Sequence, residues 1–333
     1  KTNKMKIVIV GGVAGGASAA ARARRHDEKA EIILLQSGPD VSYASCGMPY
    51  FIGGEITDRN TMAVQTPASL YSKLRIDVRV NVRVNKIDTT GKNIAGKNER
   101  TGEEFSESYD ELILAVGAAP MKPPIPGIDL PSLFALRNLE DMDNINSWID
   151  KVQHDFKHQQ DVNMHVVVAG AGFIGLEMVE QLMHRNISVS LVEMMPQILG
   201  PLDVEMAMIL EQDLRKRGVN VITGDGIKTF EDVGKNNVVV HLGSGKKLPP
   251  AQMTILGLGV RPDTAIVKEA GIECTPRGHI VVTDQMKTSA PNVWAVGDAV
   301  EIRNPILGGD EKWAVPLAGR KSYHCSHAWC WVF

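Results

Sequence analysis

Two segments of this 333-residue chain follow the same pattern, and this repeat constrains the fold more than any other feature. The first begins at Lys6 and reads KIVIVGGVAGGASAAARARR, and the second begins at His165 and reads HVVVAGAGFIGLEMVEQLMHR. Each places a β-branched run before a glycine-rich turn and a helical pattern, and another apolar run follows, at 30–36 and 188–193. The pattern predicts two βαβ units, each with a parallel sheet covered by helices, and hence an α/β fold.

The second glycine turn matches the pattern G-x-G-x-x-G at Gly170, Gly172 and Gly175. The first glycine permits a tight turn, the second lets the backbone approach a pyrophosphate, and the third lets the helix pack closely on the strand. The N–H groups of the helix that begins there would point at the phosphates. Strand, turn, helix and a following acid together predict a dinucleotide site, the alternative being a tight turn that binds nothing.

The acid at the end of the next strand is Glu193, where a carboxylate accepts hydrogen bonds from an adenosine ribose. The residues after it are Met194 and Met195. A 2′-phosphate would meet a carboxylate with no neighbouring cation, so the sequence favours NADH over NADPH.

The first glycine turn is less regular. Gly11 and Gly16 match the pattern, but Val13 occupies the middle position, and Gln36 stands where an acid is expected. The turn keeps two further glycines, Gly12 and Gly15. A glutamine can still hydrogen-bond a ribose hydroxyl, without the assistance of charge. Taken alone, this unit is compatible with a nucleotide site and with a plain βαβ turn.

Composition excludes several other classes of protein. A net charge of −3 gives no reason to expect nucleic acid or an anionic membrane as a partner. No uncharged apolar run reaches the roughly 18 residues that span a bilayer, and the start of the chain lacks a signal-peptide pattern. The cysteines are sparse and unevenly spaced, at Cys46, Cys274, Cys325 and Cys330. We therefore expect a cytoplasmic protein with reduced thiols and no metal site.

Three later motifs complete a recognisable order. They are ELILAVGAAP at 111–120, GLGVRPDT at 257–264 and TSAPNVWAVGDA at 288–299. With the two glycine turns, they make residues 5–319 resemble the flavoprotein disulfide reductases that contain two dinucleotide folds. The resemblance implies that Asp298 binds the ribityl chain of a flavin.

The resemblance also implies a domain order. An FAD domain would be discontinuous, over 1–135 and 257–319, with an NAD(H) domain inserted at 136–256. Residues 139–161 are polar and amphipathic, and predict a surface helix. The resemblance further implies that the C-terminal dimerisation domain, through which the family forms homodimers, is missing here, and that 320–333 are an aberrant tail.

The cofactor-binding residues that the resemblance implies fall into two sets. For FAD they are Gly11, Gly12, Val13, Ala14, Gly15, Gly16, Gln36, Ala115, Gly117, Gly297 and Asp298. For NADH they are Gly170, Gly172, Phe173, Ile174, Gly175, Glu177, Glu193 and Gly259.

Cys46 is the candidate catalytic residue. Many disulfide reductases of this superfamily use a C-x-x-x-x-C pair, but Val41 and Phe51 lie five residues away on either side. A single sulfur can form a mixed disulfide or be oxidised to sulfenic acid, unless it is simply a buried structural thiol. SYASCGMPY, at 42–50, resembles the motif S-[FY]-x-x-C-G-x-P-Y of coenzyme A-disulfide reductases and NADH-dependent persulfide reductases.

A coenzyme A substrate needs cations for its phosphates. In coenzyme A-disulfide reductases, positions matching Ser18, Arg22 and Arg25 line the substrate channel, and a lysine lies near the position of Lys73. Arg22 and Arg25 are three residues apart and so share a helix face, although the alternative is a solvated helix end. The remaining candidates are Ser42 and Ser45 of the cysteine motif. Ser45 stands where that subfamily often has asparagine.

The resemblance therefore implies an FAD-dependent oxidoreductase that passes electrons from NADH to Cys46 and on to coenzyme A disulfide or a persulfide. One alternative is an NADH oxidase or peroxidase that uses a cysteine sulfenic acid. Another is an inactive nucleotide-binding fragment, because the chain ends in RKSYHCSHAWCWVF and suggests a truncated or frameshifted product. The cysteine and histidine spacing of this tail fits no metal-ligand pattern.

Overall fold

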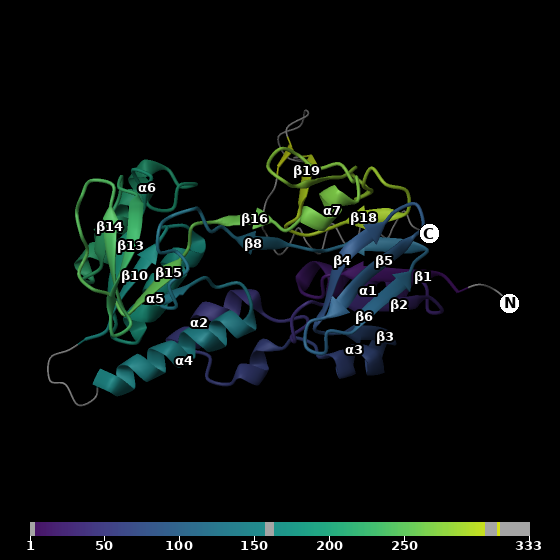
Figure 1. Cartoon of the computed structure of the whole chain (residues 1–333), viewed down its shortest axis with the longest axis horizontal. Helices are drawn as coiled ribbons and strands as arrows, with labels where there is room; N and C mark the ends of the chain where they lie inside the picture. Colours follow the sequence, from purple (N-terminus) through teal and green to yellow (C-terminus); the bar gives the residue numbers. More distant parts are fainter. Residues whose placement is uncertain (1–3, 157–162, 304–311, 314–333) are drawn as a thin grey trace. The chain divides into compact units, whose positions relative to one another are not determined.

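The computed structural model describes residues 4–156, 163–303 and 312–313. The chain forms two compact units, one made of Lys1–Tyr43, Ala63–Ala119 and Arg261–Phe333, the other of Ala44–Met62 and Pro120–Val260. Each unit contains one glycine-turn repeat and a parallel sheet covered by helices (Figure 1). The predicted α/β class with two Rossmann-like folds is confirmed.

The first unit is built around a five-stranded parallel sheet. Its central strand β1 (Lys6–Val10) pairs with β2 (Glu31–Leu35) on one side and with β7 (Glu111–Leu114) on the other. The edge strands are β3 (Ile76–Arg79) beside β2 and β18 (Val293–Ala295) beside β7. This order places β1, β7 and β18, which come from three distant parts of the sequence, side by side.

Both faces of this sheet are buried, which is why its strands read as continuous apolar runs. Ile7 and Ile9 belong to the core cluster that includes helix α1 (Ala14–His26). Val8 and Val10 belong to the cluster on the opposite face. The alanines of α1 let the helix approach the sheet closely, and those fully buried are Ala19, Ala20 and Ala23.

An antiparallel meander covers the second face of the sheet. It consists of β4 (Val82–Asp88), β5 (Asn93–Asn98) and β6 (Glu104–Ser108). The other elements of this unit are short, and they are α3 (Pro67–Leu74), α7 (Ala265–Glu269), β17 (Ile280–Val281), β19 (Val300–Arg303) and β20 (Lys312–Trp313).

One ion-pair network ties the meander to the sheet. Glu107 on β6 accepts hydrogen bonds from Lys6 Nζ on β1 and from Arg79 Nη1 on β3, the latter at 2.7 Å. Arg79 also pairs with Asp77 at 2.7 Å. Burial by itself would raise the pKa of Glu107, but the hydrogen bonds from Lys6 and Arg79 outweigh it and lower that pKa.

The second unit repeats the first arrangement. Its central strand β10 (His165–Ala169) pairs with β11 (Ser188–Val192) and with β15 (Met253–Leu256), all parallel. The edge strands are β12 (Asn220–Ile222) and β9 (Leu133–Phe134). The strand that leads into the glycine turn is therefore central in both units.

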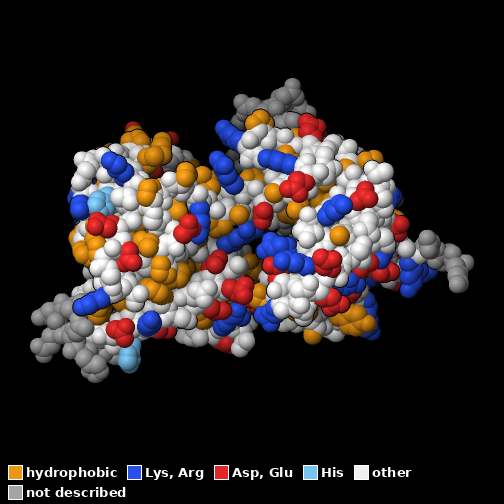
Figure 2. All heavy atoms as spheres, in the orientation of Figure 1, with side chains coloured by type: hydrophobic (Ala, Val, Ile, Leu, Met, Phe, Trp, Pro, Cys, Tyr) orange, Lys and Arg blue, Asp and Glu red, His pale blue; other side chains and the backbone are white. Residues whose placement is uncertain are grey.

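Three longer helices and a hairpin also belong to the second unit. The predicted amphipathic helix is α4 (Leu139–Phe156), which buries an apolar stripe; positions 157–161 of that prediction lie outside the described residues. The others are α5 (Phe173–His184), α6 (Val204–Lys216), and the hairpin of β13 (Ile227–Gly234) and β14 (Asn237–Leu242). Figure 2 shows hydrophobic side chains where α6 lies, and those largely exposed there are Val204, Met206, Met208 and Ile209.

Residues 44–62, hereafter the 44–62 arm, belong to the second unit although the preceding chain belongs to the first. The arm contains the 3₁₀ turn η1 (Ser45–Gly47), helix α2 (Met48–Gly53) and the 3₁₀ turn η2 (Arg59–Met62). Its ends meet, because the Ala44 N–H donates to the Met62 carbonyl at 2.8 Å.

The compact units divide the chain at other positions than the expected domain boundaries. The sequence placed 44–62 and 120–135 with the first repeat, whereas both segments pack in the second unit. The chain passes from the first unit to the second within β8 (Ala118–Pro120). It returns to the first unit at 260/261, within β16 (Val260–Pro262), rather than at 256/257. For the arm, the physical reason is α2, which buries Met48, Pro49 and Ile52.

Among the described residues, no helix combines the length and the apolar character that crossing a membrane requires.

Candidate functional site

The glycine turn of the first unit is set by two close backbone approaches. Gly11 has φ +102°, and a Cβ on it would lie 2.1 Å from the carbonyl oxygen of Ala115. A Cβ on Gly16 would lie 1.7 Å from the carbonyl oxygen of Gly11. Only glycine fits at these two positions, which bring the start of α1 against the ends of β1 and β7.

The turn of the second unit repeats both contacts. A Cβ on Gly170 would lie 2.2 Å from the Gly257 carbonyl oxygen, and one on Gly175 would lie 1.9 Å from the Gly170 carbonyl oxygen. Gly172 differs, because a Cβ there would meet no atom within 4 Å. The fold does not require glycine at this position, whereas a phosphate approaching the backbone would.

Both helices that follow these turns begin without a side-chain cap. Val13 precedes α1 and Gly172 precedes α5; neither caps its helix through a side chain, and neither first turn contains an acidic residue. The N-terminal amides and the positive end of the helix dipole suit an anionic phosphate. The φ of Val13 is −88°, so its backbone does not demand the glycine that the pattern has there.

The residues expected to bind the two riboses also brace the turns. Gln36 Oε1 accepts a hydrogen bond from the Gly12 N–H at 2.8 Å. Glu193 Oε2 accepts from the Ala171 N–H at 2.7 Å, and Glu193 Oε1 accepts from the Met195 N–H at 2.8 Å. Each side chain therefore lies at the glycine turn of its own unit.

The structure brings the other residues expected for FAD to the same edge of the first sheet. A Cβ on Gly15 would lie 3.7 Å from Gly297 Cα and 3.8 Å from Ala115 Cβ. Ala115 and Gly297 follow the carboxyl ends of β7 and β18, with Gly117 and Asp298 close behind in the chain. Dinucleotides bind at this edge of such sheets. The uncapped helix and the open glycine cradle fit FAD.

The residues expected for NADH surround the start of α5. Phe173 and Ile174 occupy its first turn, and the Phe173 side chain is 67% exposed. Glu177 follows one turn later, and burial, with Glu180 nearby, raises the pKa of its carboxyl. Gly259, with φ +94°, lies beyond the end of β15.

Cys46 lies on η1 in the 44–62 arm and is exposed, as is Ser45 before it. The other free cysteine of the described residues, Cys274, is half-buried in the first unit, and burial raises the pKa of its thiol. Exposure contradicts the structural alternative of a buried sulfur. Cys325 and Cys330 lie outside the described residues.

An acidic surface adjoins α2. The negative charge of Glu177 is the largest cause of a raised pKa at Tyr50, followed by burial and by the charges of Glu180 and Glu55. Tyr50 follows Cys46 by four residues, so both lie on one side of consecutive helical turns. Sequence reasoning missed Glu55 and Glu180, because nothing in their local pattern indicates a contact with the cysteine motif.

The residues proposed for the coenzyme A phosphates lie together on α1. Ser18 and Arg25 are exposed, whereas Arg22 is half-buried. The Nε of Arg22 is buried and has no hydrogen-bond partner among the described residues. Spacings of four and three residues place the three side chains on one helix face.

Arg24, between these arginines in sequence, has a structural role. Its Nε donates to the Leu74 carbonyl at 2.7 Å and its Nη2 to the Arg75 carbonyl at 3.0 Å, which joins α1 to the end of α3. Lys73 is exposed on α3. Ser42, with φ +48°, donates its N–H to the carbonyl of Gly12 at 2.9 Å and so lies at the first glycine turn.

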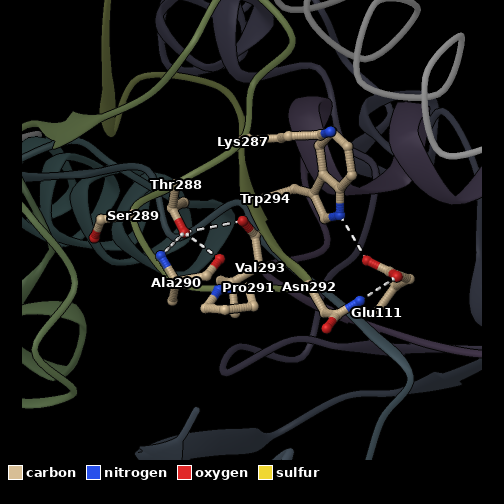
Figure 3. A pocket seen from close by; sticks show the side chains of 9 residues that line it. All are labelled: Glu111, Lys287, Thr288, Ser289, Ala290, Pro291, Asn292, Val293 and Trp294. Atoms are coloured by element: carbon tan, nitrogen blue, oxygen red, sulfur yellow. Dashed lines mark hydrogen bonds between the residues drawn. The ribbon is translucent and has the colours of Figure 1, made fainter. Parts of the chain in front are cut away.

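A cavity of about 450 Å³ lies at the opposite end of the first sheet (Figure 3). Glu111 there accepts hydrogen bonds from Asn292 Nδ2 at 2.8 Å and Trp294 Nε1 at 2.7 Å. Lys287 Nζ lies 5.2 Å from the centroid of the Trp294 ring. These polar groups satisfy one another at the amino ends of β7 and β18, away from the glycine turn, so we assign this cavity no chemistry.

Comparison with known proteins agrees with this geometry. The model of the pyridine nucleotide-disulphide oxidoreductase family matches residues 5–316. A coenzyme A disulfide reductase of Staphylococcus aureus is 33% identical over 293 residues, which are 88% of this chain and 63% of that protein. A protein of Methanocaldococcus jannaschii named NADH oxidase is 34% identical over 305 residues, covering 91% of this chain and 65% of the relative.

Solved structures show the same likeness. A reduced Bacillus anthracis protein named CoADR-RHD superposes with a TM-score of 0.91 and 40% identity, over 98% of this chain and 56% of its own. An NAD-dependent persulfide reductase from A. fulgidus superposes with a TM-score of 0.88 and 31% identity, over 97% of this chain and 58% of its own. The chain thus spans under two thirds of the length of these relatives. It belongs to the pyridine nucleotide-disulphide oxidoreductase family.

Proposed function

We propose that this chain carries the FAD- and NADH-binding part of a flavoprotein that reduces coenzyme A disulfide or a persulfide through Cys46. Two uncapped glycine turns in separate units support the two nucleotides. An exposed cysteine supports a single-thiol chemistry. Relatives named coenzyme A disulfide reductase and persulfide reductase support this substrate class.

The observation that carries the choice of substrate is Arg22. A guanidinium Nε that is buried without a hydrogen-bond partner is costly, and a bound anion would remove that cost. Arg25 and Ser18 lie on the same face and could contact the same ligand. A planar guanidinium can donate two hydrogen bonds to one phosphate, so a phosphate-rich thiol such as coenzyme A suits this face. Ser42, Ser45 and Lys73 are further candidate contacts.

NADH is the proposed reductant. Glu193 lies at the second glycine turn, and the two residues after it, Met194 and Met195, are exposed and uncharged. A carboxylate accepts hydrogen bonds from the two hydroxyls of an adenosine ribose but repels a 2′-phosphate.

The chain's own residues supply binding and sulfur chemistry. FAD, held by the first glycine turn, Gln36 and the segments ending at Gly117 and Asp298, supplies two-electron redox chemistry when bound. The Cys46 thiolate attacks one sulfur of the substrate disulfide, which forms a mixed disulfide and releases one thiolate. Two electrons from NADH and one proton then restore Cys46 and release the second thiol. The helix dipoles and Arg22 bind phosphates and do not react.

Anaerobic turnover tests this proposal. With NADH and coenzyme A disulfide, we expect two coenzyme A thiols for each NADH oxidised. Mass spectrometry of the non-reduced protein should find a coenzyme A adduct on Cys46 that is absent from Cys46→Ser. NADH oxidation without thiol release, or an adduct that persists in Cys46→Ser, would contradict the proposal.

The second candidate is an NADH oxidase or peroxidase. Two observations favour it, the exposure of Cys46 and the similarity to the M. jannaschii protein named NADH oxidase. In this case Cys46 would cycle through sulfenic acid. Oxygen or peroxide consumption that matches NADH oxidation and is lost in Cys46→Ser, with no thiol release from coenzyme A disulfide, would select this function.

A third candidate is a nucleotide-binding chain without reductase activity, which would use the two glycine turns alone. A purified protein that retains one FAD per chain and is rapidly reduced by NADH would contradict it.

A further inference from the structure

Helix α5 contacts the 44–62 arm through a buried polar side chain. Gln181, near the C-terminal end of the helix, is only 1% exposed. Its Nε2 donates to Glu55 Oε1 in the arm at 2.9 Å, and His184 Nδ1 lies 3.1 Å from the same oxygen. The Gln181 Oε1 is also buried and has no hydrogen-bond partner among the described residues. Burying an amide oxygen without a hydrogen-bond partner costs free energy, so other contacts of this side chain must compensate for that cost.

That contact explains Gly53, the last residue of α2. A Cβ on Gly53 would lie 1.8 Å from Gln181 Oε1, 2.8 Å from Gln181 Cδ and 3.0 Å from Gln181 Cβ. Gly53 does not have the positive φ of its neighbour Gly54, which ends the helix at φ +86°. Glycine at 53 therefore permits the close packing of α2 on α5, and the turn does not require it.

Further polar contacts attach the arm to the same unit. Arg185, the residue after α5, donates from Nη1 to the Ile52 carbonyl at 3.3 Å and to Asn146 Oδ1 on α4 at 2.8 Å. Arg59 Nε pairs with Asp143 on α4 at 2.8 Å. The arm is thus attached to the second unit at the C-terminal end of α2 and at η2.

The anchor is continuous with Cys46. Residues 45–53 form consecutive helical turns, η1 and α2, so Cys46 and Gly53 lie at opposite ends of one short rigid element. The hydrogen bond between Ala44 and Met62 closes the base of the arm. A displacement of α2 at Gly53 therefore also moves Cys46.

We propose that Gln181 and Gly53 are positioning residues for Cys46: their interlock holds the cysteine-bearing arm against α5, the helix that starts at the second glycine turn. One helix would then present its N-terminus to the nicotinamide nucleotide and, near its C-terminus, hold the end of α2 in the arm that carries the redox sulfur. The inference rests on the proposed role of Cys46 in disulfide reduction.

The test is a substitution cycle. Gly53→Ala introduces the clash, and Gly53→Ala/Gln181→Ala relieves it, since alanine at 181 removes the Oε1 and Cδ contacts and leaves only the Cβ contact at 3.0 Å. The matched control is Gly200→Ala, because a Cβ at Gly200 meets no atom within 4 Å and its φ is not positive. Gln181→Met keeps the size of the side chain while losing the bond to Glu55, and serves if Gly53→Ala fails to fold.

Two readouts separate positioning from general stability. Hydrogen exchange of backbone amides in the arm should accelerate at least about tenfold in Gly53→Ala. It should return part of the way towards the wild-type rate in the double variant, which is free of the clash but still lacks the bond to Glu55. In the FAD-loaded protein, thiol release from coenzyme A disulfide should fall at least about tenfold in Gly53→Ala while flavin reduction by NADH stays within about twofold, because a small displacement impairs only the step at sulfur. Gln181→Met should show both effects in the same direction, and Gly200→Ala neither.

The outcomes distinguish this inference from the proposed function. Unchanged exchange in both Gly53→Ala and Gln181→Met, or no recovery in the double variant, overturns the interlock whatever the activity. Faster exchange with undiminished thiol release overturns the positioning role and leaves the proposed function standing. A wild-type protein that accepts electrons from NADH but releases no thiol overturns the proposed function, and with it the positioning of Cys46 for that reaction.

Discussion

Gln36 Oε1 accepts a hydrogen bond from the Gly12 N–H at 2.8 Å, closing the first glycine turn with a neutral side chain. In the second unit the carboxylate of Glu193 makes the same contact to Ala171 at 2.7 Å. The two units thus share one geometry but differ in charge at the position expected to contact a ribose. A charge-assisted hydrogen bond is the stronger of the two, and the carboxylate charge is also expected to disfavour a 2′-phosphate on the ribose.

Replacing this charge should change nucleotide preference. We expect Glu193→Ala/Met194→Arg to raise kcat/KM for NADPH relative to NADH by at least about tenfold, or about 1.4 kcal/mol, because an arginine replaces a repulsive carboxylate. Steady-state kinetics with both nucleotides measures the ratio. Glu193→Gln is the control that removes the charge without adding a cation, and it should move the ratio less. An unchanged ratio in the double variant would show that Glu193 does not face the 2′ position.

Two glycines three residues apart should respond differently to alanine. Gly175→Ala places a methyl 1.9 Å from a backbone oxygen, so we expect a large loss of thermal stability. Gly172→Ala meets no atom within 4 Å, so the melting temperature should change little while NADH binding weakens. Thermal unfolding and NADH titration separate the effects, and equal destabilisation by both substitutions would contradict the assignment of Gly172 to the ligand.

The neighbouring arginines of α1 should also differ. Arg22→Ala should raise KM for coenzyme A disulfide about tenfold or more without lowering the melting temperature, because the charged hydrogen bonds lost are those to the ligand. Arg24→Ala should lower the melting temperature instead, because it removes donors to the carbonyls of Leu74 and Arg75. The reverse pattern would show that Arg22 is structural.

The Glu107 network predicts how the free energy of unfolding depends on pH. Its hydrogen bonds lower the folded-state pKa of Glu107 below the usual value of 4.5, so the ionised carboxylate stabilises the fold above that value. This stabilisation is lost as pH falls through the folded pKa. We expect Glu107→Gln to cost about 2 kcal/mol at pH 7 and progressively less in acid. Urea unfolding from pH 7 downwards measures the difference, and a cost that does not depend on pH would contradict the network's role.

His165 predicts a second dependence in a higher pH range. Its ring nitrogens lie 3.0 Å from Ser190 Oγ and 3.2 Å from the Pro250 carbonyl oxygen, and burial lowers its pKa from 6.5. The folded state therefore favours the neutral ring, and its contribution is complete above pH 6.5 and falls as pH drops towards the folded pKa. The stability difference between wild type and His165→Gln should shrink between pH 7.5 and 5.5, as measured by thermal unfolding. A constant difference would show that the ring titrates as in the unfolded chain.

Sequence reasoning succeeded where the contact is local. Gly11 and Gly16 are five residues apart, and any chain that turns from strand to helix in this way brings the second onto the carbonyl of the first. The helix α4 was equally predictable, because its apolar stripe repeats at helical spacing. The difference between Arg22 and Arg24 could not be predicted, because both are arginines on one helix. Only the packing of α3 beside Arg24 distinguishes them.

The amino-acid sequence by itself determined the two βαβ units, the positions of their glycine turns and the presence of a lone cysteine in a recognisable motif, since these depend on residue type and short spacing. Tertiary packing alone decided that the 44–62 arm joins the second unit, that Gly53 fits against Gln181, and that the Nε of Arg22 is buried without a hydrogen-bond partner among the described residues. These features depend on contacts between segments that lie far apart in the sequence, more than a hundred residues in the case of Gly53 and Gln181. No local sequence pattern predicts such contacts.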